Sequence, residues 1–155
     1  MCFRALALGV FLLAASLPPL LAGTHDRVKI PSVKTSIYIG SVTLIPETLH
    51  RENGTYTAAY QAKVFPYFFF SETGRLSIGF SDEQLATLDR GERVEFTGTA
   101  KNDDGEDRRV EGHATPDSAG ATSGKIKVRI FVSAKIELVF NTTYQFEGDA
   151  APGSK

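Results

Sequence analysis

The C-terminal part of the chain alternates between apolar and polar residues over an unusually long stretch. From Ile126 to Phe146 every second residue except Thr142 is apolar, and the phase never changes. Successive side chains of a β-strand point to opposite faces, so this period of two predicts strands with one buried face. Because no Gly, Pro or Asp interrupts the stretch and Ser133-Ala134-Lys135 is a poor turn, one long bent strand and a hairpin remain equally good interpretations.

The same alternation runs through most of the chain and predicts an all-β fold. Further strands are expected at Thr35–Pro46, Thr55–Phe70, Arg75–Phe80, Arg93–Lys101 and Arg108–Thr115. The regular spacing of these segments indicates an antiparallel barrel or sandwich of about seven strands.

Two turns set the expected strand pairing. Asn53-Gly54 is the residue pair most typical of a two-residue hairpin turn, and it would place Ile45 opposite Ala62 and Leu49 opposite Ala58. Asp103-Asp104-Gly105 supplies the odd-length connection that brings the apolar residues of its two flanking strands onto one face.

One short surface helix is expected after Phe80. Ser81 is followed three residues later by Gln84, which is the pattern of a capping box, and Gly91 stands where a C-cap glycine is favoured. Its apolar stripe consists of Leu85, Ala86 and Leu88, so the helix should lie on a surface.

The N-terminus has the parts of a secretory signal peptide. One positive charge at Arg4 precedes an apolar run from Ala5 to Leu17 and a small-residue exit, so we expect residues 1–23 to be removed after Ala22 or Gly23. This predicts export to the periplasm or the extracellular space, with one β domain at 24–147, no membrane span after cleavage and a flexible tail at 148–155. Cys2, the only cysteine, lies in the leader, so no disulfide framework is expected.

Composition narrows the classes of partner. The chain carries 17 basic and 18 acidic residues, which argues against nucleic acid and against a polybasic membrane patch. Asn53-Gly54-Thr55 and Asn141-Thr142-Thr143 match glycosylation sequons, but a tight turn and strand residues explain them equally.

Aromatic residues crowd into one segment, since five of the six positions from Phe65 to Phe70 are Phe or Tyr. If Glu72-Thr73-Gly74 is a three-residue loop, Phe68 and Phe70 pair with Ile78 and Leu76 on the core face. The remaining residue, Pro66, is where this register would fail, because proline favours a bulge or an edge.

The opposite face of that strand pair is the candidate ligand or partner surface. In the expected register Tyr67 and Phe69 overhang the small residues Gly79 and Ser77. These rings and Phe65 need cover, for which the nearest apolar source is the short helix. The candidate residues are Phe65, Tyr67, Phe69, Ser77, Gly79, Leu85 and Leu88. Covered core is the preferred interpretation, ahead of a ligand wall and a partner surface.

No residue pattern predicts a catalytic site, a metal site or a cofactor. Asn102–Asp107 resembles a calcium loop only in part, because Ala100 occupies the first ligand position and the flanks are strands. Glu111 and His113 share the polar face of one strand, but no nucleophile or third partner accompanies them, so a solvated outer face is favoured.

The sequence therefore favours an exported, non-enzymatic binding module that holds an apolar or amphipathic small molecule. It predicts an internal cavity of several hundred Å³. The alternative is a structural or interaction protein of the cell envelope that uses an aromatic surface or a strand edge to bind a partner protein.

Overall fold

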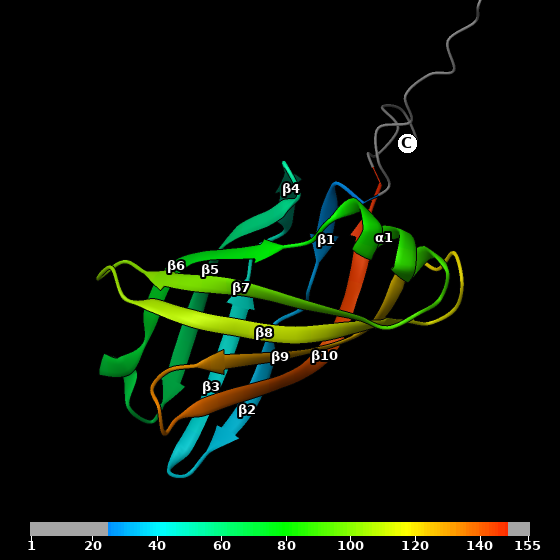
Figure 1. Cartoon of the computed structure of the whole chain (residues 1–155). Helices are drawn as coiled ribbons and strands as arrows, with labels where there is room; N and C mark the ends of the chain where they lie inside the picture. The colour runs from blue at the N-terminus through cyan, green and yellow to red at the C-terminus, as the bar shows by residue number, and fades with distance from the viewer. Residues whose placement is uncertain (1–24, 149–155) are drawn as a thin grey trace, which may run out of the picture.

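The computed structural model describes residues 25–148, which form ten strands, one α-helix and one short 3-10 helix (Figure 1). The strands are β1 (Arg27–Lys29), β2 (Val33–Ile37), β3 (Gly40–Pro46), β4 (Leu49–Glu52), β5 (Thr55–Phe65), β6 (Glu72–Gly79), β7 (Val94–Asn102), β8 (Asp107–Pro116), β9 (Ser123–Phe131) and β10 (Glu137–Glu147). The helices are η1 (Phe68–Phe70) and α1 (Asp82–Asp89). The predicted signal peptide and all but the first residue of the predicted tail lie outside the described residues.

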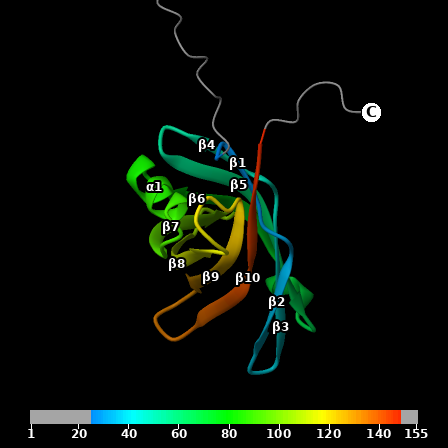
Figure 2. The ribbon, with the colours of Figure 1, turned by 90° about the vertical axis from the view of Figure 1, so that its right-hand side faces the viewer.

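The strands form one antiparallel sheet that closes into a barrel. Its order is β2-β3-β5-β4-β1-β10-β9-β8-β7-β6, and β5 also pairs with β6, so eight strands form a closed ring. The pair β2–β3 extends the wall along the second half of β5, and β2 lies beside β10 (Figure 2). The all-β prediction is confirmed, and the structure decides for a barrel over a sandwich.

The Asn53-Gly54 turn is confirmed, since both residues have positive φ, at 50° and 76°. The predicted register holds in β4, where His50 lies opposite Thr57. In β3 it is wrong by one residue, because Leu44 instead of Ile45 lies opposite Ala62. The shift arises between Pro46 and Leu49, where the chain leaves the ladder.

Two predicted strands end earlier than expected. The segment Thr35–Pro46 is not one strand but the hairpin β2–β3, with Tyr38 and Ile39 at its tip. The predicted strand to Phe70 stops at Phe65, and η1 occupies the turn that follows. Glu72-Thr73-Gly74 is consequently the start of β6 and not a loop.

The expected pairing of the aromatic segment is therefore wrong. Leu76 lies opposite Ala58 and Ile78 opposite Tyr56, whereas Phe68 and Phe70 pair with neither. The physical reason is Pro66, which has no amide hydrogen for the ladder and ends the strand where it stands. The inward face of β5 from Tyr56 to Val64 alternates as expected.

The other local predictions agree with the structure. Residues 126–146 form the hairpin β9–β10 rather than one bent strand, and Asp103-Asp104-Gly105 connects β7 to β8 with Gly105 at φ 86°. The capping box of α1 is present, because Ser81 and Gln84 exchange side chain–backbone hydrogen bonds. The helix packs on β7 and β8 with Leu85 and Leu88 buried.

The barrel core lies mainly at the end covered by α1. Its largest contributors there are Tyr56, Phe80, Phe96, Tyr144 and Phe146, each at most 8% exposed. Among residues 25–148 no helix is both long and apolar enough to cross a membrane.

Candidate functional site

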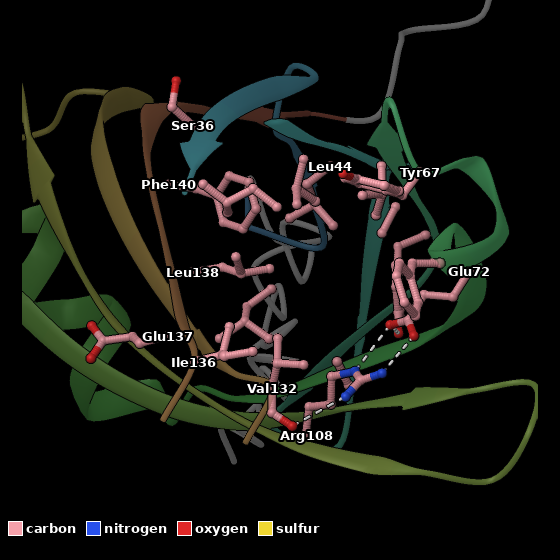
Figure 3. A pocket seen from close by; sticks show the side chains of 18 of the residues that line it. Ser36, Leu44, Tyr67, Glu72, Arg108, Val132, Ile136, Glu137, Leu138 and Phe140 are labelled. Carbon is pink, nitrogen blue, oxygen red and sulfur yellow. Dashed lines mark hydrogen bonds and ion pairs between the residues drawn. The ribbon is translucent and has the colours of Figure 1, made fainter. Parts of the chain in front are cut away.

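The other end of the barrel is hollow. A pocket of about 690 Å³ opens between the β2–β3 turn, the β5–β6 loop and the β9–β10 loop (Figure 3). It lies at the end opposite α1, because β6 begins at the pocket and leads to the helix at its far end (Figure 1). Three loops therefore surround the mouth of the pocket.

The pocket walls are mostly aliphatic. Side chains from six strands contribute, namely Val42, Leu44, Ala62, Val64, Leu76, Ala100, Ile130, Leu138 and Phe140. In Figure 3, Leu44, Leu138, Ile136 and Phe140 face the cavity, whereas Glu137 points away from it. Such a lining suits an apolar molecule.

The pocket exists because small inward residues occupy this end of the barrel. Ala62 of β5 and Ala100 of β7 stand at positions where the closed end has large rings such as Tyr56 and Phe96. At the closed end, a void of only about 40 Å³ remains between the side chains. Along the same strands, the inward residues therefore change from large rings at the closed end to small side chains at the open end.

One ion pair interrupts the apolar lining. The guanidinium of Arg108 on β8 binds the carboxylate of Glu72 on β6 with two hydrogen bonds, Nη2–Oε2 at 2.7 Å and Nε–Oε1 at 3.1 Å. The Arg108 and Glu72 side chains are 14% and 20% exposed. Arg108 also donates to Glu106 Oε2 at 3.2 Å and to the carbonyl of Val132 at 3.4 Å.

Two further side chains complete this polar cluster, which consists of Tyr60, Glu72, Asn102, Glu106 and Arg108. The Tyr60 hydroxyl donates to Glu72 Oε1 at 3.1 Å, and Asn102 Nδ2 donates to both Glu72 and Glu106. Glu106 returns a hydrogen bond from its backbone N–H to Asn102 Oδ1 at 2.8 Å. Satisfying so many buried polar groups holds the cluster in one geometry.

A glycine lets the Tyr60 ring approach β6. Gly74 lies opposite Tyr60, and a Cβ at this position would stand 2.9 Å from the tyrosine ring and 2.2 Å from the carbonyl oxygen of Lys101. Any other residue would push the ring or the β6–β7 ladder aside.

The electrostatics of the cluster favour the charged pair. Burial alone would raise the pKa of Glu72, but hydrogen bonds from Arg108, Asn102 and Tyr60 outweigh it and hold the pKa below the usual 4.5. The hydrogen bond to Glu72 raises the pKa of Arg108. Burial and the Glu72 carboxylate both raise the pKa of the Tyr60 hydroxyl, so it stays protonated and continues to donate.

The structure divides the candidate surface residues between the two ends of the barrel. Tyr67 is half-buried and lines the pocket, while Phe65 and Phe69 lie beside the mouth, 59% and 76% exposed. Ser77 and Gly79 lie on β6 opposite Thr57 and Thr55, away from these rings. The expected cover by Leu85 and Leu88 is wrong, because both are buried beneath α1 at the closed end.

The other sequence candidates lie outside the pocket. Glu111 faces Arg129 and His113 faces Lys127 across the β8–β9 pair, and neither lines the cavity. Burial and the neighbouring cations Arg93 and Lys127 lower the pKa of His113. Among the described residues, no three His, Cys, Asp or Glu side chains gather closely enough to hold a metal ion.

Sequence reasoning missed most of the pocket. The sequence pattern puts Glu72 in a loop, suggests only a partial calcium motif around Asn102 and assigns no role to Arg108. Their strand phase would have found them, because Glu72 is in phase with the buried Leu76, and Arg108 is in phase with the buried Val110.

Comparisons of this chain with protein-family models, with curated proteins and with solved structures find no match. The geometry alone therefore supports any statement about function. It offers an apolar cavity with a polar cluster in its wall, an arrangement suited to holding a small molecule.

Proposed function

We propose that this protein is an exported, non-enzymatic binding module that holds an apolar or amphipathic small molecule in the barrel pocket. The observation that carries the proposal is the cavity of about 690 Å³ with aliphatic walls. Small-molecule pockets commonly measure roughly 300–1,000 Å³, so a drug- or lipid-sized molecule fits.

The polar cluster narrows the chemistry of the ligand. A guanidinium has five N–H groups, and four of those on Arg108 meet the oxygens of Glu72, Glu106 and Val132. One N–H is left for a ligand acceptor. Because two carboxylates already surround Arg108, an anionic group would be repelled, and a neutral carbonyl or hydroxyl group is the better partner.

Binding is tested with a fluorescent apolar probe whose emission rises in apolar surroundings. The Ala62→Phe substitution fills the pocket from β5 and should weaken probe binding by about tenfold or more. Ala59→Phe on the outer face of the same strand is the matched control and should bind as the wild type does. Equal binding by wild type and Ala62→Phe, with both folded, contradicts the proposal.

The natural ligand and the export step need separate measurements. Native mass spectrometry of protein purified from its own source should show a co-purified small molecule whose volume fits the cavity of about 690 Å³. N-terminal sequencing of the exported protein should begin at Gly23 or Thr24. A full-length N-terminus would contradict the export proposal.

The exposed aromatic loop favours a second function, an interaction protein of the cell envelope. Phe68, Phe69 and Phe70 are each at least 66% exposed, so they offer an apolar surface to a partner protein. The same mass spectrometry distinguishes the two functions, since a protein partner would appear as a stable heavier complex.

A further inference from the structure

The exposed large apolar side chains of residues 25–148 gather at one place. They are Tyr38, Ile39, Phe65, Phe68, Phe69, Phe70 and Ile136, and each is at least 52% exposed. All belong to the three loops around the pocket mouth or to the strand end that leads into one of them. Single exposed apolar residues are normal, but seven around one opening mark an interaction surface, which we call the apolar rim.

The rim is a built structure and not a loose loop. In the β5–β6 loop the backbone N–H of Phe70 donates to Tyr67 and that of Ser71 to Phe68, at 3.1 and 3.0 Å. The Ser71 hydroxyl accepts from the Val64 backbone N–H at 3.0 Å and ties the loop to β5. The rings of Phe69 and Phe70 touch with centroids 4.5 Å apart. These contacts hold the aromatic rings outward in water.

The charges beside the rim have one sign. The segments 30–46, 53–71 and 131–136 contain three lysines, Lys34, Lys63 and Lys135, and no acidic or other basic residue. Lys34 and Lys63 lie on the outer face in one row across β2, β3 and β5, because each pairs with Thr43. Lys135 precedes Ile136 in the β9–β10 loop. Glu72 and Glu137, which directly follow two of these segments, are paired with arginines.

We propose that the apolar rim docks the barrel, mouth first, onto the surface of a lipid bilayer that contains anionic lipids. Rings on three separate loops can enter the interfacial layer together, while lysines behind them meet lipid phosphates. A protein partner recognised by strand addition would use an edge, and one recognised as a helix would use a groove; the rim is a ring of loop tips around an opening.

The docking surface goes beyond the proposed ligand binding and is separable from it. Phe68 and Phe69 belong to the rim but do not line the pocket. Their removal should therefore abolish docking and leave probe binding in the pocket unchanged. Conversely, Ala62→Phe should block the pocket and leave docking intact.

Docking is tested by co-sedimentation of the purified protein with vesicles of phosphatidylcholine and phosphatidylglycerol. The double variant Phe68→Ser/Phe69→Ser should bind the vesicles at least about tenfold more weakly. Each ring that enters the bilayer removes apolar surface from water, and this favours binding. Tyr38→Ser, in a different loop and fully exposed, should weaken binding independently without a folding penalty.

The contribution of the lysines to docking is tested by binding to the same vesicles. Lys34→Glu/Lys63→Glu should reduce binding by about tenfold or more, and the loss should vanish on phosphatidylcholine alone. Lys29→Glu/Lys125→Glu makes the same charge change at the closed end and should bind as the wild type does.

Three results would overturn the docking proposal. One is a wild-type protein that stays in the supernatant with both kinds of vesicle. Another is undiminished vesicle binding by both rim variants. A third is a concentration-dependent dimer that Phe68→Ser/Phe69→Ser converts to monomer in the absence of vesicle binding, which assigns the rim to self-association.

Discussion

Replacing Glu72 by Gln tests whether the polar cluster stabilises the barrel through charge. Glu72 accepts four hydrogen bonds, two from Arg108 and one each from Asn102 and Tyr60. Gln keeps the shape but places an NH₂ group where one carboxylate oxygen accepted from Arg108 and Asn102, or from Arg108 and Tyr60. The new NH₂ group then faces the N–H of Arg108 and one other donor, so neither of these two hydrogen bonds can form.

The expected cost at neutral pH is about 2 kcal/mol of unfolding free energy. A hydrogen bond to a charged group contributes roughly 1.5–3 kcal/mol, and two of them to Arg108 are weakened or lost. The Glu72 side chain is 20% exposed, so water compensates part of the loss. Substituting Arg108 by Met should cost more, because it leaves the carboxylate without a cation in an apolar wall.

The pH dependence of the unfolding free energy shows whether the charge of Glu72 causes the stabilisation. The pKa of Glu72 lies below its usual 4.5 in the folded protein, so the stabilisation is fully present above the unfolded value. As the pH falls through the folded pKa, Glu72 takes up a proton and the stabilisation is lost. The difference between wild type and Glu72→Gln should therefore be constant near neutrality and shrink as the pH falls below the usual carboxyl pKa.

The assay is urea unfolding of the folded full domain at several pH values, followed by circular dichroism. Glu137→Gln is the matched control, because Glu137 also binds an arginine bidentately, Arg129 at 2.5 and 2.9 Å, but on the outer face (Figure 3). Its effect should be too small to resolve. A Glu72→Gln effect that is independent of pH, or no larger than the control, would refute the charge-based account.

Three other substitutions have expected effects on urea unfolding. Gly74→Ala should cost about 1–3 kcal/mol, because the new methyl group meets the Lys101 carbonyl and the Tyr60 ring; a neutral result would mean that β6 and β7 separate easily. Ser81→Ala removes the capping box of α1 and should cost about 1 kcal/mol, whereas Ser81→Thr should restore most of it. Leu49→Ala should cost about 2–5 kcal/mol because Leu49 is 1% exposed in the packed end, and a loss below about 1 kcal/mol would contradict that packing.

The fold class was predictable because alternation and turn chemistry agree locally. Asn53-Gly54 and Asp103-Asp104-Gly105 are turns whose residues adopt positive φ easily, and both were located correctly. The turn at Tyr38-Ile39 was not found, because two large apolar residues give no turn signal. Closure into a barrel depends on the pairing of β5 with both β4 and β6, and alternation within a strand says nothing about its neighbours.

The aromatic segment was misread for a specific reason. Alternation carries the expected strand through Pro66 and puts Phe68 and Phe70 on the core face, which agrees with the cost of exposing large rings. In the structure they are 69% and 66% exposed. The burial rule fails at this loop, and such failures are expected where a surface serves a partner or a membrane rather than the fold.

Inward polar residues are the signal that connects sequence to site in this barrel. Asn102, in phase with the buried Ala100, and Arg108, in phase with the buried Val110, occupy inward positions where a packed core would need apolar side chains. A charged residue in such a phase must find a partner inside, and the only acidic residue in inward phase on β6 is Glu72. Given that β7 lies between β6 and β8, strand phase therefore brings Glu72 and Arg108 to the same inward face. Glu72 and Arg108 thus place the polar cluster in the wall of the pocket, whose inward positions at Ala62 and Ala100 are too small to fill it.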